Sequence, residues 1–225
     1  MRTASYHVHT DFCDGSNTPE EMIQAAISAG MTDIALTAHA AWPFASEWHL
    51  PVRRYAEYID AVRRAGAAFN GRIRVLAGFE ADYIRGVTAP DPAVYKPFAP
   101  DIIVGSVHYV PGKGSTPWAV DAPADQVARG IEDAFGGDGR KAVRAYWGAV
   151  REMVSSYGFD VVGHRDVIRK RNGTLRFFDE TESWYRRELR ETAKAIARAG
   201  KIVELNTGCI ARKAIDGVYP SDEML

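Results

Sequence analysis

The sequence has few cysteines and no long apolar run. Only two cysteines, Cys13 and Cys209, occur among the 225 residues, which excludes a disulfide-rich secreted scaffold and favours a reducing compartment. No run approaches the roughly 18 apolar residues of a membrane-spanning helix. The first residues include polar and histidine side chains rather than an apolar signal region. We therefore expect a cytoplasmic protein with no membrane partner.

Several common functional motifs are also missing. The sequence contains no phosphate-binding Walker loop, no glycine-rich dinucleotide turn after a strand, and no Gly-x-Ser-x-Gly nucleophile elbow. The formal net charge of −1 provides no broad basic surface, so nucleic acid is not an expected partner. With 46% hydrophobic and 25% charged residues, the composition is that of an ordinary globular protein with a sizeable core.

Short apolar runs alternate with amphipathic segments along the chain. The predicted strands are Ala4–His9, Asp33–Thr37, Ile73–Glu80, Asp101–His108, Asp160–Gly163 and Lys201–Leu205. One predicted helix starts at Thr18. The other predicted helices span Tyr55–Ala68, Lys141–Tyr157 and Glu182–Ala199. This alternation predicts an α/β fold with a parallel sheet, as a barrel or a doubly wound sheet, in one domain over residues 1–225.

Two stretches interrupt this alternation. Ala41–Pro51 and Val110–Asp138 both contain aromatic residues and prolines, Val110–Asp138 also contains glycines, and we expect both stretches to be irregular. Long loops that follow strands often contact substrates in α/β proteins. A surface insertion with its own small apolar cluster explains the same residues equally well.

Histidines and glutamates follow the predicted strands. Five of the six histidines and two glutamates stand where apolar runs end: His7, His9, His39, His108, His164, Glu80 and Glu204. Parallel βα folds gather functional groups at the carboxyl ends of their strands, and residues i and i+2 of a strand face the same side. The pattern therefore predicts one shared cluster.

Imidazole mixed with carboxylate suits Zn²⁺, Mn²⁺ or Fe²⁺ rather than the all-oxygen shells of Ca²⁺ or Mg²⁺. The number of candidate ligands exceeds what one tetrahedral ion needs, so two or three ions that share a carboxylate are expected. Such ions generate hydroxide near neutral pH and bind phosphoryl oxygens. The thiol of Cys13 is close in sequence, but we expect an ordinary half-buried thiol rather than a ligand.

Several motifs resemble the polymerase and histidinol phosphatase (PHP) superfamily. They are His7-Val8-His9-Thr10, Phe12-Cys13-Asp14-Gly15, Thr18-Pro19-Glu20-Glu21 and His39 after a strand. A second set looks like the histidinol-phosphate phosphatase branch: Gly78-Phe79-Glu80-Ala81-Asp82-Tyr83, Ser106-Val107-His108-Tyr109-Val110, Gly163-His164-Arg165-Asp166, Glu204-Leu205-Asn206-Thr207 and Tyr219-Pro220-Ser221. The resemblance covers essentially the whole chain.

The resemblance implies a distorted (β/α)7 barrel with up to three metal ions. By position, His7, His9 and Glu80 hold the first ion, Glu80 bridges to a second ion on His108 and His164, and Asp14 with His39 holds the third. Glu80, His39 and Asp14 are accordingly the implied catalytic residues. The implied reaction is the hydrolysis of L-histidinol phosphate to L-histidinol and phosphate in histidine biosynthesis, and a homo-oligomer is compatible with it.

Two arginines are candidates for the phosphate group. Arg169 and Arg212 follow predicted strands and correspond to phosphate-binding positions of similar proteins, and a guanidinium binds phosphate through paired hydrogen bonds. Solvated surface arginines are the alternative. Glu204 and Asn206 are expected to orient metal ligands rather than to bind an ion.

The chain departs from the family pattern in two places. Ala38 stands where the superfamily usually has an aspartate before the histidine, which leaves His39 without a partner of that kind. The family also continues to a final strand with an Asp and a His ligand, for which this sequence has no counterpart, so we expect a barrel without its last strand. The alternatives are therefore another phosphoesterase of the superfamily, such as a nuclease, or a metal-binding protein with impaired catalysis.

Overall fold

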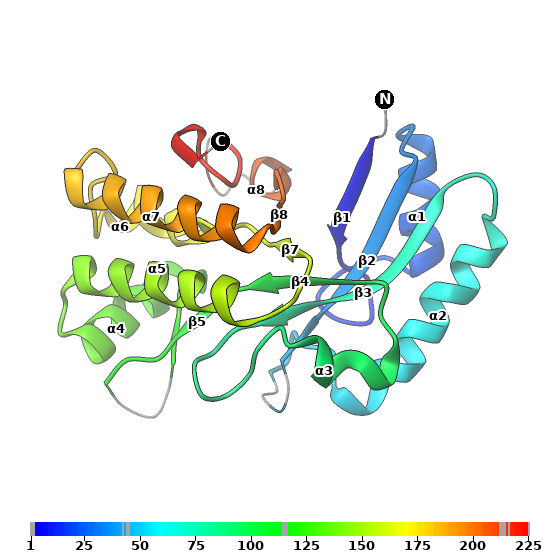
Figure 1. Ribbon diagram of the computed structural model, residues 1–225, viewed down its shortest axis with the longest axis horizontal. Helices are drawn as coiled ribbons and strands as arrows, with labels where there is room; N and C mark the ends of the chain where they lie inside the picture. Colours follow the sequence, from blue (N-terminus) through cyan, green and yellow to red (C-terminus); the bar gives the residue numbers. More distant parts are fainter. Residues whose placement is uncertain are drawn as a thin grey trace. The chain divides into compact units, whose positions relative to one another are not determined.

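The structure is a computed structural model that describes residues 3–41, 43, 46–113, 117–211, 215 and 217–224. Strands and helices alternate along the chain (Figure 1). The chain divides into two compact units, which we describe one at a time. The first comprises Met1–Asp82, Val87–Gly105 and Gly158–Val161, and the second comprises Tyr83–Gly86, Ser106–Tyr157 and Val162–Leu225. These are units of packing, and a single domain over residues 1–225 remains a prediction.

The first unit is built on a parallel sheet. Its elements are β1 (Ala4–Val8), α1 (Pro19–Ser28), β2 (Asp33–Ala40), η1 (Val52–Arg54), α2 (Tyr55–Ala68), β3 (Arg74–Asp82), α3 (Pro92–Tyr95), η2 (Lys96–Phe98) and β4 (Ile102–Ser106), whose last residue belongs to the second unit. Neighbouring strands follow the order β1-β2-β3-β4. β2 pairs in parallel with β1 and with β3, which confirms the predicted α/β class.

Helices α1 and α2 form as their sequences predict. Thr18 caps α1 through its side chain, Pro19 is the first helical residue, and Glu21 completes the capping box. The predicted helix Tyr55–Ala68 is observed with the same bounds, and it buries residues at helical spacing: Tyr55, Tyr58, Ile59, Val62 and Ala65. Both helices pack against this sheet (Figure 1).

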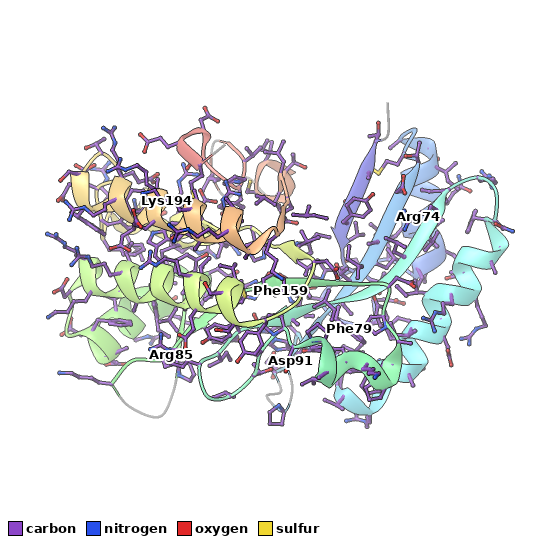
Figure 2. The ribbon with its side chains drawn as sticks, in the orientation of Figure 1. Arg74, Phe79, Arg85, Asp91, Phe159 and Lys194 are labelled. Atoms are coloured by element: carbon purple, nitrogen blue, oxygen red, sulfur yellow. The ribbon has the colours of Figure 1, made fainter. Side chains whose placement is uncertain are left out.

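The strand β3 contributes Phe79 to an aromatic cluster in the core of the first unit. Phe79, labelled in Figure 2, packs against the rings of Tyr55, Tyr58 and Tyr95. A methyl group added at Gly78 would lie 2.2 Å from the carbonyl oxygen of Ile102. The absence of a side chain at Gly78 therefore lets Ile102, the first residue of β4, lie close to β3 two residues before Glu80.

The second unit is mostly helical. Its elements are β5 (Tyr109–Val110), β6 (Trp118–Ala119), α4 (Ala124–Phe135), α5 (Gly139–Ser156), β7 (Val161–Val162, which begins in the first unit), η3 (Val167–Arg171), α6 (Asn172–Leu175), α7 (Ser183–Ala199), β8 (Ile202–Val203), α8 (Gly208–Ala211) and η4 (Asp222–Met224). α5 and α7 lie side by side (Figure 1) and bury Trp147 and Tyr185 between them. None of the described helices combines the length and apolar character that crossing a bilayer requires.

The expectation that Val110–Asp138 is irregular was wrong. The segment contains the β5–β6 hairpin and the helix α4, which buries Val127, Ile131 and Ala134 at spacings of four and three residues. This spacing and Gly136, which takes a left-handed conformation directly after the helix, were visible in the sequence. The turn residues around them obscured the helix.

Candidate metal centre

The two histidines of β1 reach one carboxylate oxygen. His7 Nε2 lies 2.9 Å and His9 Nε2 lies 3.4 Å from Oε2 of Glu80. Glu80 is 1% exposed, and its position in β3 directs its side chain to the same side as the two imidazoles. The i, i+2 spacing in a strand explains why both rings can face a single point.

Strand register adds a third histidine to this group. His39 and Glu80 are direct partners in the pairing of β2 with β3, and His39 Nδ1 lies 2.8 Å from the same Glu80 oxygen. Ala38, which replaces the aspartate expected from the family pattern, donates its backbone N–H to Tyr58 Oη at 3.0 Å. The position of His39 is therefore set by the pairing of β2 with β3 and by the contact of its ring with Glu80.

The loop after β1 brings Asp14 to the other side of the histidines. Asp14 Oδ1 lies 3.4 Å from His9 Nδ1 and 3.7 Å from His39 Nε2. The loop folds back because the N–H groups of Cys13 and Gly15 both donate to the Thr10 carbonyl at 3.0 Å. The rings of His9 and His39 stack with centroids 4.2 Å apart, so one carboxylate can serve both.

Burial controls the protonation of this cluster. Burial first, and the neighbouring His39 second, lower the pKa of His9 to about 3. Burial raises the pKa of Asp14, but the hydrogen bond and the charge of His39 outweigh it and hold this pKa below its usual value. At neutral pH, His9 is therefore neutral with a lone pair available, and Asp14 is ionised, which are the states that bind metal ions.

A hydrogen-bonded series that we did not predict lies beside the cluster. His49 Nε2 is 2.7 Å from Asp82 Oδ2, and Ser46 Oγ is 2.5 Å from His49 Nδ1. The His49 ring stacks on Trp48, whose edge meets the His39 ring at a centroid distance of 4.5 Å. Asp82 could have been found from the sequence, because it stands two residues after Glu80 in the same strand. His49 could not, because it lies in the irregular stretch that we expected after β2.

The second unit contains a pair of histidines. His108 Nε2 and His164 Nε2 are 3.2 Å apart. Asp121 bonds to Lys170 Nζ at 2.8 Å. Burial raises the pKa of Asp121, but the nearby His108 and Lys170 outweigh it, so the net shift is downward. Asp121 is a further acidic group of this pair that sequence reasoning missed, because nothing in the loop before α4 marks it.

Glu204 contacts the backbone of the histidine pair. Its Oε1 accepts from the N–H of His164 at 2.5 Å and from Asn206 Nδ2 at 3.0 Å. This contact is of the orienting kind expected for Glu204 and Asn206. That Glu80 bridges to an ion on His108 and His164 stays a prediction.

Only one of the two predicted phosphate-binding arginines lies among the described residues. Arg169 lies in η3, where its Nε donates to Glu180 at 2.7 Å and its Nη1 lies 3.4 Å from Asp166. Arg212 lies outside the described residues. Phosphate binding by either arginine therefore stays a prediction.

The donor groups of the first unit fit a transition metal. Two sets of ligand atoms lie within 4.8 Å of one another, one from His9, His39 and Glu80 and one from His9, Cys13 and Asp14. Neutral imidazole with a carboxylate is the donor set that Zn²⁺, Mn²⁺ and Fe²⁺ prefer. The buried position of Glu80 among three imidazoles would be costly for a protein without a cation there.

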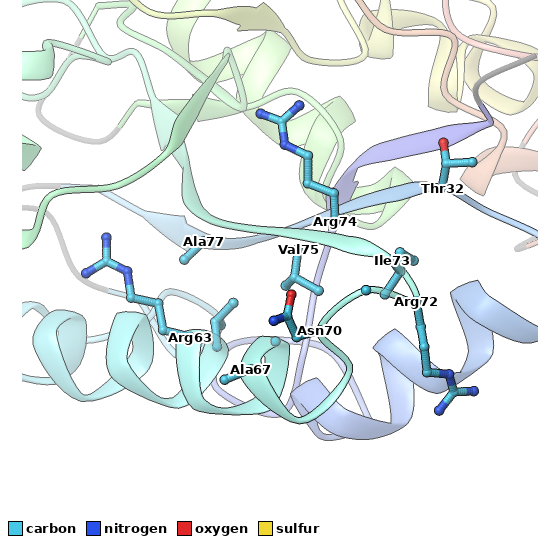
Figure 3. A pocket seen from close by; sticks show the side chains of 12 residues that line it. Thr32, Arg63, Ala67, Asn70, Arg72, Ile73, Arg74, Val75 and Ala77 are labelled. Atoms are coloured by element: carbon cyan, nitrogen blue, oxygen red, sulfur yellow. The ribbon is translucent and has the colours of Figure 1, made fainter.

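The cavity drawn in Figure 3 lies away from these donors. It has a volume of about 710 Å³ and is lined by α2, by the turn that follows it and by the first half of β3, including Arg63, Asn70, Arg72 and Arg74. Glu80 stands near the opposite end of β3. Because the carboxyl ends of parallel strands hold the functional groups, this cavity at the amino ends is not part of the candidate centre.

Comparison with known proteins supports this interpretation. A protein of Deinococcus radiodurans named probable histidinol-phosphatase is 32% identical over 167 residues, which cover 73% of this chain and 60% of that relative. This chain thus spans about three fifths of the length of the curated relative. The crystal structure of a putative histidinol phosphatase from Listeria monocytogenes matches with a TM-score of 0.86 at 20% identity and covers 99% of this chain and 89% of that one.

A second similar structure is histidinol phosphate phosphatase from Lactococcus lactis, which was solved with zinc, L-histidinol and phosphate. It matches with a TM-score of 0.63 at 21% identity, and the match covers 95% of this chain and 76% of that one. These likenesses confirm the fold that the PHP resemblance implies. The PHP domain pattern matches residues 5–208. The chain is a member of the PHP domain family.

Proposed function

We propose that the protein is a metal-dependent phosphoric monoester hydrolase that converts L-histidinol phosphate to L-histidinol and phosphate in histidine biosynthesis. The observation that carries this proposal is the convergence of three imidazole nitrogens on one buried oxygen of Glu80, at 2.9, 3.4 and 2.8 Å. The name of the Deinococcus relative and the ligands in the Lactococcus structure support the choice of substrate.

We propose two to three divalent ions, zinc, manganese or iron, as cofactors. The proposed ligands are His7, His9, Asp14, His39 and Glu80 in the first unit and His108 and His164 in the second. When bound, such ions supply a hydroxide nucleophile near neutral pH and stabilise the charge of the phosphoryl group.

The protein groups then have separate tasks. Glu80, His39 and Asp14 are the proposed catalytic residues, because they hold the ions around the phosphoryl group. Arg169 and Arg212 are proposed to bind the phosphate oxygens, and Glu204 fixes the orientation of His164 through its backbone N–H. We place the reaction in the cytoplasm, where the two free cysteines stay reduced.

The test is phosphate release from L-histidinol phosphate by the chain loaded with Mn²⁺ or Zn²⁺. Parallel reactions use p-nitrophenyl phosphate and single-stranded DNA. We expect release to be fastest with L-histidinol phosphate. Faster turnover of another ester identifies a different phosphoesterase, and no release from any substrate identifies a metal-binding protein with impaired catalysis; both results overturn the proposal.

A matched pair of variants connects activity to the cluster. Glu80→Gln keeps the size of the side chain but removes its charge, and we expect metal content and turnover to fall together by about 10- to 100-fold or more. Glu57→Gln makes the same change on the exposed side of α2, where Glu57 pairs only with Arg54 among the described residues. Equal activity in the two variants would contradict the role of Glu80.

A further inference from the structure

Cys13 lies against the metal-binding cluster rather than apart from it. Its Sγ is 3.5 Å from His9 Nδ1, and the same nitrogen is 3.4 Å from Asp14 Oδ1. These three side chains form a set of donors within 4.8 Å of one another, one nitrogen, one sulfur and one oxygen. The set differs from the nitrogen and oxygen donors around Glu80.

The two distances agree with a tetrahedral ion. Ligands at about 2.05 Å for nitrogen, about 2.1 Å for oxygen and about 2.3 Å for sulfur separate nitrogen from sulfur by about 3.5 Å and nitrogen from oxygen by about 3.4 Å around such an ion. The observed separations are 3.5 and 3.4 Å. The sulfur of Cys13 and the carboxylate oxygen of Asp14 lie within 4.8 Å of each other, so rotations of these two side chains would let all three ligands share one ion.

The backbone holds this arrangement in place. The N–H groups of Cys13 and Gly15 share the carbonyl of Thr10 as an acceptor. A methyl group at Gly15 would lie 2.7 Å from the Thr10 nitrogen and 2.8 Å from the His9 carbonyl carbon. Only glycine lets the loop return this closely to the end of β1, which brings Cys13 and Asp14 to His9 Nδ1.

We propose that Cys13, His9 Nδ1 and Asp14 bind one metal ion, and that the Cys13 sulfur makes this position selective for a thiophilic ion such as Zn²⁺ over Mn²⁺. Binding exchanges the thiol proton for the metal ion, because a coordinating thiol is deprotonated. His9 then keeps its proton on Nε2 and donates toward Glu80 Oε2, 3.4 Å away, so His9 serves this ion, and His7 and His39 remain as the imidazole ligands of an ion at Glu80. The proposal deepens the metal centre of the proposed function and rests on it.

The test uses cobalt as a spectroscopic probe for zinc. The metal-free protein is loaded with Co²⁺, excess ion is removed, and bound cobalt is measured by elemental analysis. A cobalt–thiolate bond gives a charge-transfer band in the near ultraviolet that nitrogen and oxygen ligands do not give. We expect this band in the wild type, its loss in Cys13→Ser, and its retention in Cys209→Ser.

Cys209 is the matched control, because it is buried in the second unit and its Sγ donates to the Gly217 carbonyl at 3.0 Å. Wild-type protein that binds cobalt without the band overturns the proposal, whatever the variants do. So does a band that persists in Cys13→Ser, or one that Cys209→Ser abolishes. Protein that binds no cobalt overturns this proposal and the metal centre together.

A chemical measurement separates a sulfur–metal bond from a sulfur–imidazole hydrogen bond. We expect Zn²⁺ to slow the alkylation of Cys13 by iodoacetamide, followed by peptide mass spectrometry, and Mn²⁺ to leave it unchanged. Equal alkylation with and without Zn²⁺ contradicts the proposal. Phosphate release from L-histidinol phosphate in protein that lacks the cobalt band would overturn only the role of Cys13, and a band without phosphate release would overturn only the proposed reaction.

Discussion

Removing the hydroxyl group of Tyr58 should destabilise the first unit. Tyr58 is fully buried, and its Oη accepts the N–H of Ala38 at 3.0 Å, directly before His39. Phenylalanine keeps the ring and its packing against Phe79 but leaves a buried backbone donor without an acceptor. An unsatisfied buried group of this kind costs about 1 to 3 kcal/mol, so Tyr58→Phe should lower the free energy of unfolding by that amount.

Tyr95→Phe provides the matched control. Tyr95 is equally buried and packs against the same Phe79 ring, but its Oη has no hydrogen-bond partner in the part of the chain that the structure describes. Removing this hydroxyl should leave stability unchanged or raise it, because a buried polar atom without a partner is itself unfavourable. The two variants lose the same atom from the same aromatic cluster, so their difference isolates the hydrogen bond.

The assay is unfolding in urea with metal removed, because bound ions would add a stabilisation of their own. We expect a lower midpoint for Tyr58→Phe at an unchanged slope, since the surface exposed on unfolding is the same. Equal midpoints for the two variants would refute the argument, and a changed slope would show that Tyr58→Phe alters the unfolded or folded state instead.

Three further predictions follow from the packing, the capping and the electrostatics. Gly78→Ala forces a methyl group to within 2.2 Å of a backbone oxygen of β4 and should lower the free energy of unfolding by about 3 kcal/mol. Gly148→Ala is the control, because Gly148 lies inside α5 with nothing within 4 Å of the added methyl group, and it should raise the free energy of unfolding by about 0.5 to 1 kcal/mol. Urea midpoints that move in the same direction in both variants contradict this prediction. Thr18→Ala removes the side-chain cap of α1 and should cost about 1 kcal/mol, which thermal unfolding detects as a lower Tm; an unchanged Tm would show that the cap is not needed. Burial first, and His39 second, lower the pKa of His9 from 6.5 to about 3, so the unfolded chain binds this proton below pH 6.5 while the folded chain does not bind it until near pH 3. Metal-free protein should therefore lose stability as the pH falls through this window, and urea titrations at pH 7 and pH 5 should show a smaller loss in His9→Gln; the same loss in both proteins counts against the shift.

Local patterns predicted most of the elements in the first unit. The capping box at Thr18 and the helical spacing from Tyr55 to Ala65 depend only on neighbouring residues, and both elements appear where the sequence places them. The strands were harder to delimit. The run Lys201–Leu205 was predicted as a strand, but the observed strand is only Ile202–Val203, because strand length depends on the partner and not on the run itself.

The candidate site was predicted in its residue types but not in its full membership. Strand-end histidines and Glu80 could be found because parallel sheets bring strand ends together. The His39–Glu80 pairing needs the register between β2 and β3, which no single strand encodes. His49 and Asp121 lie in loops, where no period relates sequence to direction, and Cys13 was expected to be an ordinary thiol although it contacts His9.

The complete burial of β2 gives its polar residues a role in folding specificity. Every residue from Asp33 to Ala40 is buried, so neither face of this strand is distinguished by apolar side chains. Asp33 and His39 share one face, since they are an even number of residues apart, and a slip of one residue would turn both to the wrong side. His39 therefore marks the correct alignment of the strand as well as contacting Glu80. Substitutions at such a residue act on the choice among alternative strand pairings, and selection for chemistry at this position is at the same time selection against misfolding.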